Sequence, residues 1–282
     1  MMCGWGEEYV WYGKEGGKRF MAVYKKELRQ SLQSWGIWTG AVALMMVVCV
    51  ALFPQMKDEM EGVSSIFANM GGFTAAFGMD KLNFGEFMGF YGIECGNVLG
   101  IGGGFFAALT GITALSKEEK DRTAEFLFTH PVSRASVLVQ KLLAVLTQII
   151  TMNAVIVAVV LIAAAAVGEQ FSGKQFFLLH AAYLLLMLEI SFICFGISAF
   201  LRRGSAGAGL GLALALYCMN LLCNLSSKME FLQWLTPYAY AEASEIVAGD
   251  GPDIGLIIAG VVLAAAVTSA GWLKYVNKDL AA

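Results

Sequence analysis

Charged residues are scarce in this chain of 282 residues. They make up 15% of the sequence, whereas hydrophobic residues make up 58% and the mean hydropathy is +0.66. Soluble domains carry about 25% charged residues, so this chain has too few to cover an ordinary water-facing surface. The shortage excludes a typical soluble enzyme and a disordered chain, and the formal net charge of -3 argues against a nucleic-acid-binding surface. We therefore expect a membrane protein without a nucleic-acid partner.

Proline is also rare, and its positions fall between the long apolar runs of the chain. The four prolines are Pro54, Pro131, Pro237 and Pro252. All of them lie outside those runs, where a missing backbone donor does little harm. We therefore expect the first apolar run, and the helix that it forms, to end at Pro54.

Sequence patterns for catalysis and for metal or nucleotide binding are lacking. The six cysteines show no Cys-x-x-Cys spacing, so neither a zinc site nor a disulfide framework is indicated, and we expect no metal. No stretch fits the phosphate loop G-x-x-x-x-G-K-[ST]. We identify no catalytic residue and expect this chain to bind no cofactor itself.

Six long apolar runs dominate what the sequence does contain. Each is long enough to cross a hydrocarbon core of about 30 Å as a helix. Backbone groups in lipid must pair within their own segment, so the runs should be helices. The sequence therefore predicts an all-α, polytopic membrane protein with six transmembrane helices. The expected spans are residues 37–53, 87–115, 142–167, 176–201, 206–225 and 254–272.

Positive charge is unevenly divided between the two sides that six spans define. With the N-terminus in the cytoplasm, only four of the nineteen basic residues face outward. An excess of Lys and Arg is typical of cytoplasmic loops, so we place both termini in the cytoplasm. Residues 1–33 should form a cytoplasmic tail with an interfacial helix, and residues 34–282 the six-helix domain. The outward four are Lys57, Lys81, Lys174 and Lys228.

Two outward connections are longer than the topology requires. Residues 55–86 and 226–253 each carry several acidic residues, and the second also contains Trp234, Tyr238 and Tyr240. Because Trp and Tyr favour the headgroup level of a bilayer, we expect short interfacial helices in both connections. A functional gate and a structural cap both fit this composition, and we favour the cap.

The connection between the second and third spans, residues 116–141, reads SKEEKDRTAEFLFTHPVSRASVLVQK. Ser116 and Glu119 form a capping box, so a helix should begin directly after Ser116. It should end before Pro131, because proline pushes the preceding residue out of the helical region. Ser133 should cap the next helix, which leads into the third span. The sequence thus predicts a cytoplasmic elbow joined to two membrane helices.

The charges of this elbow favour a protein partner over lipid. Residues 117–125 carry four acidic and three basic side chains, whereas a helix on the headgroups usually has a polar face rich in Lys and Arg. Residues 126–128, Phe-Leu-Phe, form an apolar tip. An apolar tip surrounded by mixed charges suits a groove on another protein. An ordinary interfacial helix is the alternative, and we favour docking to a partner.

Two motifs in the elbow carry a family resemblance. Residues 118–127 read EEKDRTAEFL, residues 131–134 read PVSR, and Lys141 follows. This pattern resembles the cytoplasmic signature of type-2 ABC-transporter permeases. It departs from the usual form at Arg122, where Gly is common, and at residues 126–128, which replace a leucine pair. Weaker matches are residues 26–29, 235–238 and 275–280.

The resemblance implies a function and a set of partners. It implies the membrane subunit of an ABC exporter with six spans, located in the bacterial plasma membrane and working as a homodimer or as a heterodimer with a second permease. A separate ATPase subunit would bind ATP and Mg and hold the elbow. The substrate is not indicated by any feature of the sequence. On this basis the ATPase-coupling helix comprises Glu118, Asp121, Arg122, Glu125, Phe126, Leu127, Phe128, Pro131 and Arg134.

Two carboxyl groups lie within the predicted spans. Glu94 is in the second span, towards its outer end, and Glu189 is near the middle of the fourth. A carboxylate at bilayer depth costs at least about 2.5 kcal/mol, so such residues are candidates for a functional site. Either they contact a substrate or ion along a transport path, or they are packed, partnered or protonated. His180 is too far along its helix to pair with Glu189.

Glycines recur every four residues along the second span and again on the fifth. This spacing repeats the G-x-x-x-G motif, which lets two helix backbones approach closely. It predicts a helix-packing surface, either within one subunit or at the seam of a dimer, and the resemblance places both spans near the subunit interface. The glycines are Gly92, Gly96, Gly100 and Gly104, with Gly207 and Gly211 on the fifth span.

Two other functions are compatible with the sequence. An ion-coupled secondary transporter would use Glu94 and Glu189 for its coupling ion, although the two halves of the chain show no inverted repeat of the kind common in such folds. A non-transporting membrane anchor for an ATPase would need the same elbow. Transport without ATP would favour the first, and ATPase binding without substrate-dependent hydrolysis would favour the second.

Overall fold

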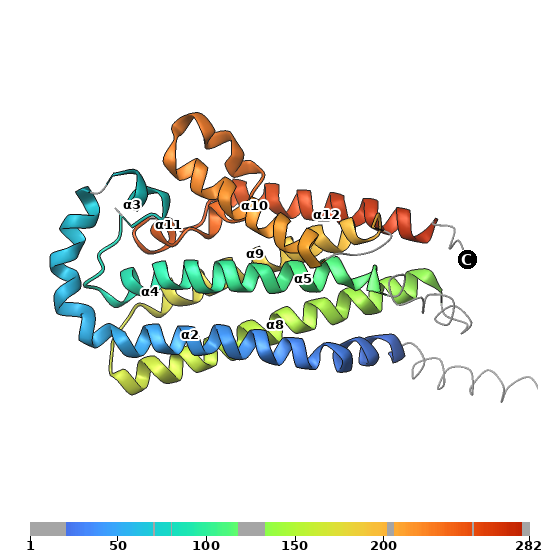
Figure 1. Cartoon of the computed structure of the whole chain (residues 1–282), viewed down its shortest axis with the longest axis horizontal. Coiled ribbons are helices and arrows are strands. Elements are labelled where there is room, and N and C mark those ends of the chain that lie inside the picture. Colours follow the sequence, from blue (N-terminus) through green and yellow to red (C-terminus); the bar gives the residue numbers. More distant parts are fainter. Residues whose placement is uncertain are drawn as a thin grey trace, which may run out of the picture.

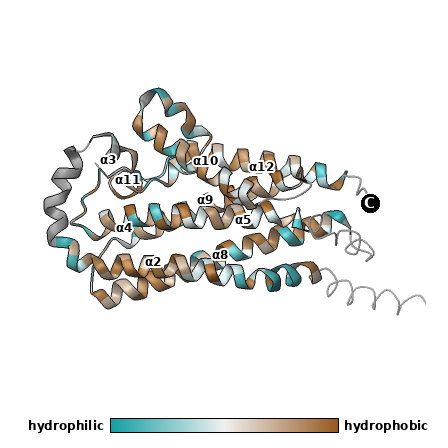
Figure 2. Ribbon diagram, viewed as in Figure 1, coloured by the Kyte–Doolittle hydropathy of each residue, from teal (hydrophilic) through white to brown (hydrophobic). Residues whose placement is uncertain are grey.

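A computed structural model describes residues 21–69, 71–79, 81–117, 133–201, 206–249 and 251–277. Over these ranges every regular element is a helix (Figure 1). Six of the helices are long and apolar enough to cross a membrane (Figure 2). The predicted all-α fold with six membrane helices is therefore confirmed. The spans are Ala22–Lys57, Phe87–Ala114, Arg134–Val167, Gly173–Ser198, Ala206–Leu225 and Ile254–Val276.

Helix α2, Ala22–Asn69, continues through the residue at which we expected the first span to end. Pro54 lies inside the helix, where it removes the hydrogen bond to the carbonyl of Val50 and favours a kink. Figure 1 shows the C-terminal part of α2 turning away from the direction of the bundle. The expected end at Pro54 was wrong, because a proline can bend a helix without ending it. Helix α2 also runs unbroken past residue 33, where we placed a boundary.

The second span consists of three segments, α4 (Phe87–Cys95), η1 (Gly96–Gly103) and α5 (Gly104–Ala114). The middle segment is a π-helix, in which hydrogen bonds from residue i to residue i+5 widen the turn. It coincides with the part of the span that is richest in glycine. Sequence reasoning did not predict it. Since π-helical turns occur frequently at functional sites, it draws attention to the side chains around this segment.

Helix α9 (Gly173–Ser198) lies at the centre of the bundle and packs against α5, α8 (Arg134–Val167) and α12 (Ile254–Val276). Gly196 of α9 and Gly271 of α12 bring two backbones into contact, since a Cβ atom at either position would overlap the other helix. Small residues allow the same close approach in many membrane proteins. Sequence reasoning had expected such packing only on the second and fifth spans.

One end of the bundle carries both long connections. The first contains the bent end of α2 and a short helix, and the second contains three short helices that follow α10. The short helices predicted in both connections are therefore present. In chain order these elements are α3 (Gly72–Ala76), α10 (Ala206–Leu225), η2 (Ser227–Trp234), η3 (Ala239–Ala241) and α11 (Ala243–Val247).

The opposite end holds the start of α2, the end of α5, the start of α8 and the end of α12 (Figure 1). Arg134 Nη1 donates a hydrogen bond to the backbone oxygen of Val276 at 3.2 Å, and Lys117 Nζ donates to Gln30 Oε1 at 2.8 Å. The first and last described residues therefore lie at the same end of the bundle, as an even number of spans requires. That this end faces the cytoplasm stays a prediction.

Candidate functional site

Most of the predicted coupling helix lies outside the described residues. The residues of the predicted coupling helix that lie outside the described ranges are Glu118, Asp121, Arg122, Glu125, Phe126, Leu127, Phe128 and Pro131. The remaining member, Arg134, is the partly buried first residue of α8. Ser133 caps that helix as predicted, since its Oγ accepts a hydrogen bond from the backbone N–H of Ser136 at 3.2 Å. The start of the third span is thus fixed by a local interaction that the sequence made visible.

A buried lysine joins the helices on both sides of the segment 118–132. The side chain of Lys141 in α8 is 1% exposed, and its Nζ donates to Glu27 Oε1 at 2.9 Å and to the backbone oxygen of Ala114 at 2.7 Å. Glu27 belongs to α2, and Ala114 is the last residue of α5. The cation therefore also satisfies a carbonyl that the end of a helix leaves unpaired. We call Glu27, Ala114 and Lys141 the lysine joint.

The first turn of α2 is held at the same place. The backbone N–H groups of Val23 and Tyr24 donate to Gln140 Oε1 at 3.1 and 3.2 Å. The hydroxyl of Tyr24 lies 3.0 Å from Thr147 Oγ1. A helix N-terminus leaves its first N–H groups without intrahelical partners. Here a side chain of α8 accepts the hydrogen bonds of two of these N–H groups. Gln140 and Lys141 are neighbours in the sequence, so two successive side chains of α8 bind α2 and hold it against α8.

The two carboxyls within the spans have different surroundings. Glu94 is partly buried, and the thiol of Cys49 in α2 donates to its Oε2 at 3.6 Å. Glu189 is 2% exposed and lies against Gly260 of α12 so closely that a Cβ atom would not fit there. Neither carboxyl oxygen of Glu189 has a hydrogen-bond partner among the described residues, although the Tyr240 hydroxyl lies nearby. Glu94 therefore faces α2, whereas Glu189 faces α12.

Side chains of the same chain fill the glycine ridge of the second span. Tyr183 lies on α9, and Tyr238 precedes η3. The hydroxyl of Tyr238 also donates to the backbone oxygen of Gly100 at 3.0 Å. Within one chain the ridge therefore serves packing, which is one of its two expected uses. The contacts that a Cβ atom would make are Gly92 with Ala243, Gly96 and Gly100 with Tyr183, and Gly104 with Tyr238.

The two glycines of the fifth span are placed differently. Gly207 and Gly211 are exposed on α10. In the described part of the chain, no atom lies within 4 Å of the position that a Cβ of Gly211 would take. Another helix can approach this open surface closely. A dimer seam at these two positions stays a prediction.

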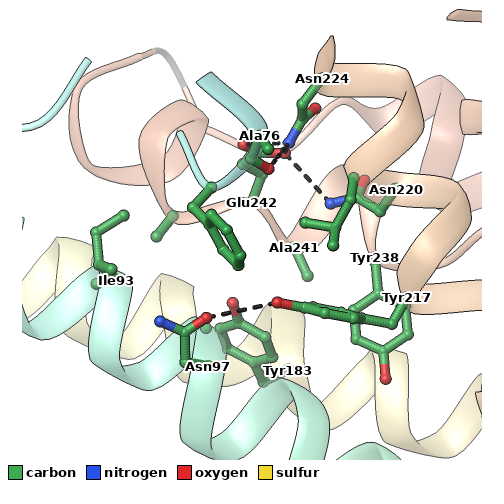
Figure 3. Close-up of a pocket in the computed structure, with 15 residues that line it drawn as sticks. Ala76, Ile93, Asn97, Tyr183, Tyr217, Asn220, Asn224, Tyr238, Ala241 and Glu242 are labelled. Carbon is green, nitrogen blue, oxygen red and sulfur yellow. Dashed lines mark hydrogen bonds between the residues drawn. The ribbon is translucent and has the colours of Figure 1, made fainter. Parts of the chain in front are cut away.

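A small cavity lies among the tyrosines at the end of the bundle that carries the long connections (Figure 3). Its volume is about 50 Å³, which is room for a few water molecules at about 10–15 Å³ each. Its wall combines residues of α4, η1, α9 and α10 with residues of both long connections, so the cavity exists only once both connections have folded onto the bundle. The polar and aromatic lining residues include Asn97, Tyr183, Tyr217, Asn220, Asn224, Tyr238 and Glu242.

Amide groups hold the carboxylate of Glu242 in the wall of this cavity. Asn224 Nδ2 lies 2.9 Å from both carboxylate oxygens, and Asn220 Nδ2 lies 3.5 Å from Oε2. The hydroxyl of Ser244 donates to Oε1 at 3.4 Å. Burial raises the pKa of Glu242, and hydrogen bonds from Asn224 and Asn220 and the charge of Lys81 offset part of that rise. The site thus supplies partners for a charged carboxylate although it is largely buried.

Two contacts bring the first long connection to the same carboxylate. Asn224 Nδ2 also donates to the backbone oxygen of Ala76 at 3.0 Å. Gly78 has a φ of 64° and lies so close that a Cβ atom would be 2.7 Å from Glu242 Oε1. Any other residue would be strained in this left-handed conformation and would also crowd the carboxylate. Both long connections therefore meet at Glu242.

Sequence reasoning did not name these residues as a site. Glu242 was only one acidic residue of a connection, and Glu27 and Lys141 were only parts of the family resemblance. One signal was present, because Asn220 and Asn224 lie one helical turn apart in an apolar span, where amides need partners. The partners themselves come from distant segments, and sequence spacing does not reveal them.

A comparison with protein families relates the whole bundle to known proteins. The model of the family described as ABC-2 family transporter protein matches residues 21–280. A comparison with curated proteins found no match. The match covers all six membrane helices, and the membrane subunits of this family are generally non-catalytic. The chain therefore belongs to the ABC-2 transporter family and is a permease-type, multi-pass membrane component of an ABC transporter.

Proposed function

We propose that this chain is the membrane subunit of an exporter that is driven by ATP hydrolysis in a separate subunit. ATP and Mg bind to that partner, and residues 117–128 pass its motion to the second and third spans. Two permease subunits, either two copies of this chain or one copy and a sister chain, open a path along their interface. The complex resides in the bacterial plasma membrane.

The lysine joint carries this proposal. Lys141 connects the end of α5 with α8, the two helices that flank the coupling segment, and it also binds Glu27 of α2. A force applied to that segment therefore reaches three helices through buried contacts. Breaking a buried ion pair by removal of one partner costs about 3–5 kcal/mol, so the three helix ends should move as one body.

The distribution of basic side chains supports a cytoplasmic position for the lysine joint. Most described basic residues lie at that end of the bundle, and an excess of Lys and Arg is typical of the cytoplasmic side. The end with the cavity carries fewer, and two of these pair with acidic residues. The first group is Lys25, Lys26, Arg29, Lys117, Arg134, Lys141 and Lys274, and the second is Lys57, Lys81, Lys174 and Lys228.

Disruption of the coupling helix gives the direct test. Glu125→Arg combined with Leu127→Asp reverses one charge and places a carboxylate within the apolar tip. We expect co-purification of the ATPase, and ATP hydrolysis by the reconstituted complex, to fall by about tenfold or more, because central interface residues often contribute over 2 kcal/mol. Lys174→Glu, a charge reversal on an exposed residue at the other end, is the matched control. Undiminished binding and hydrolysis in the double variant would refute the proposal.

The two alternatives predict other outcomes in assays of transport and of ATP hydrolysis. An ion-coupled transporter would move substrate without ATP, but Glu94 and Glu189 face different helices and form no common ion site within the described part of the chain. An anchor would bind the ATPase through the elbow without any substrate-dependent hydrolysis. Transport assays with and without ATP therefore separate the three functions.

A further inference from the structure

The second long connection does not stay at the end of the bundle. Thr236 Oγ1 donates a hydrogen bond to the backbone oxygen of Leu216 at 2.8 Å. Leu216 lies nine residues, or about 14 Å, before the end of α10. The Tyr238 hydroxyl donates to the backbone oxygen of Gly100 at 3.0 Å, and Gly100 lies thirteen residues from one end of the second span and fourteen from the other. The connection therefore reaches the middle of the bundle.

The chain then turns back to the end of the bundle from which it came. Gln175, in the first turn of α9, donates from Nε2 to the backbone oxygen of Val247 in α11 at 2.7 Å. Non-helical backbone at membrane depth is tolerated only where protein surrounds it or where it lines a water-filled cavity. Five of the six residues 236–241 are buried, so protein surrounds this part of the chain. We call residues 236–241 the re-entrant segment.

The re-entrant segment meets Glu189, the carboxyl group in the middle of the fourth span. The Tyr240 hydroxyl lies beside this carboxyl, and the two side chains are 1% and 2% exposed. On the other side lies Gly260 of α12, where a Cβ atom would overlap the carboxyl. Neither carboxyl oxygen of Glu189 nor the Tyr240 hydroxyl has a hydrogen-bond partner elsewhere in the described part of the chain. The carboxyl is therefore enclosed between the re-entrant segment and α12.

No described cation neutralises this carboxyl group. Helix α9 packs against α4, η1, α5, α8, α11, α12 and η3, and only Tyr240 among their described ionisable groups acts on the carboxyl of Glu189. An isolated carboxylate is costly at membrane depth, so a buried carboxyl without a counter-charge takes up a proton. The other ionisable side chains of these elements, of α9 itself and beside η3 are Tyr91, Glu94, Cys95, Arg134, Lys141, Lys174, His180, Tyr183, Cys194, Tyr238, Glu242, Glu245, Lys274 and Tyr275.

We propose that Glu189 is a proton-binding site that holds the re-entrant segment in the bundle. As a carboxylic acid, Glu189 forms a hydrogen bond with the Tyr240 hydroxyl and carries no charge to be hydrated. When its O–H bond breaks, the proton passes to water, and the carboxylate that remains needs water around it. Water reaches the carboxylate only if its cover moves away, so loss of the proton releases the re-entrant segment. This site rests on the contacts described above and not on the proposed function.

Infrared difference spectra between pH 6 and pH 9 test the proton itself. The full chain is measured without an ATPase in dodecyl maltoside micelles, because this detergent has no carbonyl group. A carboxylic acid has a carbonyl stretching band that a carboxylate lacks. We expect a band at pH 6 that is absent from Glu189→Gln, persists in Glu94→Gln and disappears by pH 9. A Glu189 band that is missing at pH 6 or that remains at pH 9 overturns the proposal.

The same band tests whether Tyr240 is the partner of the acid. Tyr240→Phe removes only the hydroxyl, so the carbonyl band of Glu189 should move to higher frequency, as in a carboxylic acid without a hydrogen bond. Tyr217→Phe is the matched control, because the Tyr217 hydroxyl lies 3.5 Å from Asn97 Oδ1 and does not act on Glu189. A merely structural role of Tyr240 would not change the frequency. An unshifted band in Tyr240→Phe overturns the proposal.

Hydrogen exchange of residues 236–247 reports whether the re-entrant segment is released. Wild type and Glu189→Gln are compared at the same pH, so the direct effect of pH on exchange is equal in both. Because glutamine stays neutral, we expect equal exchange at pH 6 and about tenfold faster exchange in the wild type at pH 9. Equal exchange at pH 9, or faster exchange in the wild type already at pH 6, overturns the proposal. Loss of ATPase coupling in the elbow variant would instead count against the proposed function alone.

Discussion

Each end of the bundle contains a carboxylate that binds several segments, and the two carboxylates have different surroundings. Glu27 binds the buried ammonium of Lys141, so the chain itself supplies the opposite charge. Glu242 receives amide N–H groups from Asn224 and Asn220 and borders a cavity whose wall holds no other charge among the described residues. Glu189, in the middle of the fourth span, has neither kind of partner in the described part of the chain.

The difference lies in how each carboxylate is held, by an ion pair at one end and by neutral amides at the other. An ion pair that is satisfied within the chain holds α2, α5 and α8 together and leaves no charge for another molecule. At Glu242 two neutral amides hold the carboxylate by hydrogen bonds, and the positive charge of Lys81 acts on it as well. The end beside the coupling segment is therefore fixed by opposite charges, whereas the end with the cavity is held mainly by hydrogen bonds from neutral side chains.

The largest effect should follow from breaking the ion pair. Lys141→Met leaves Glu27 without its buried partner and removes the hydrogen bond to Ala114. We expect a loss of about 3–5 kcal/mol in the free energy of unfolding, measured by SDS titration in mixed micelles. Lys26→Met removes an exposed lysine of α2 and should change stability by about 0.5 kcal/mol or less.

A second substitution tests whether the pair itself is responsible. In Glu27→Met with Lys141→Met no charge is left unpaired, so the double variant should be more stable than Lys141→Met alone. A double variant that is as unstable as the sum of both single variants would show that the two side chains act separately. The contrast between the two ends of the bundle would then lose its basis.

Crowding of the Glu242 carboxylate by a Cβ atom at position 78 should have an intermediate effect on stability. Gly71 and Gly78 both have positive φ angles of 69° and 64°. A Cβ atom at Gly78 would lie 2.7 Å from Glu242 Oε1, whereas none of the described atoms lies within 4 Å of one at Gly71. Gly71 has a ψ of -133°, so its backbone strain is its own and Gly71→Ala shows only what a Cβ costs without crowding. Gly78→Ala should lower the free energy of unfolding by about 1–3 kcal/mol through crowding of the carboxylate, in addition to its backbone strain. Thermal stability of Gly78→Ala equal to that of the wild type would mean that Gly78 does not confine the carboxylate.

The sequence predicted those features that depend on lipid or on neighbouring residues. Six apolar runs became six helices because backbone groups in lipid have no other partners. The cap at Ser133 was predicted because it needs only a residue three positions further along. Pro54 was misjudged because its local preference for a helix end was weaker than the continuation of α2 on both sides.

Features that join distant segments could not be predicted in the same way. The lysine joint connects residues 27, 114 and 141, and the cavity of Glu242 needs four helical segments and both long connections. The glycine ridge was visible as a pattern, but Tyr183 and Tyr238, which fill it, lie 79 or more residues away in the sequence. Composition indicated where polar groups are unusual, and only the fold showed which of them meet.

The smallest effect concerns the pH dependence of stability at Glu242. Burial raises the pKa of Glu242 above its ordinary value of 4.5, so the folded protein still holds this proton at a pH where the unfolded chain has released it. Its contribution to stability is therefore greatest below pH 4.5 and declines as the pH rises through the raised pKa. Glu242→Gln should remove this part of the decline in thermal stability, whereas Glu245→Gln should retain it. An unchanged decline in Glu242→Gln would mean that other groups cause it and that the amides of Asn220 and Asn224 leave the Glu242 carboxylate as stable as it is in water.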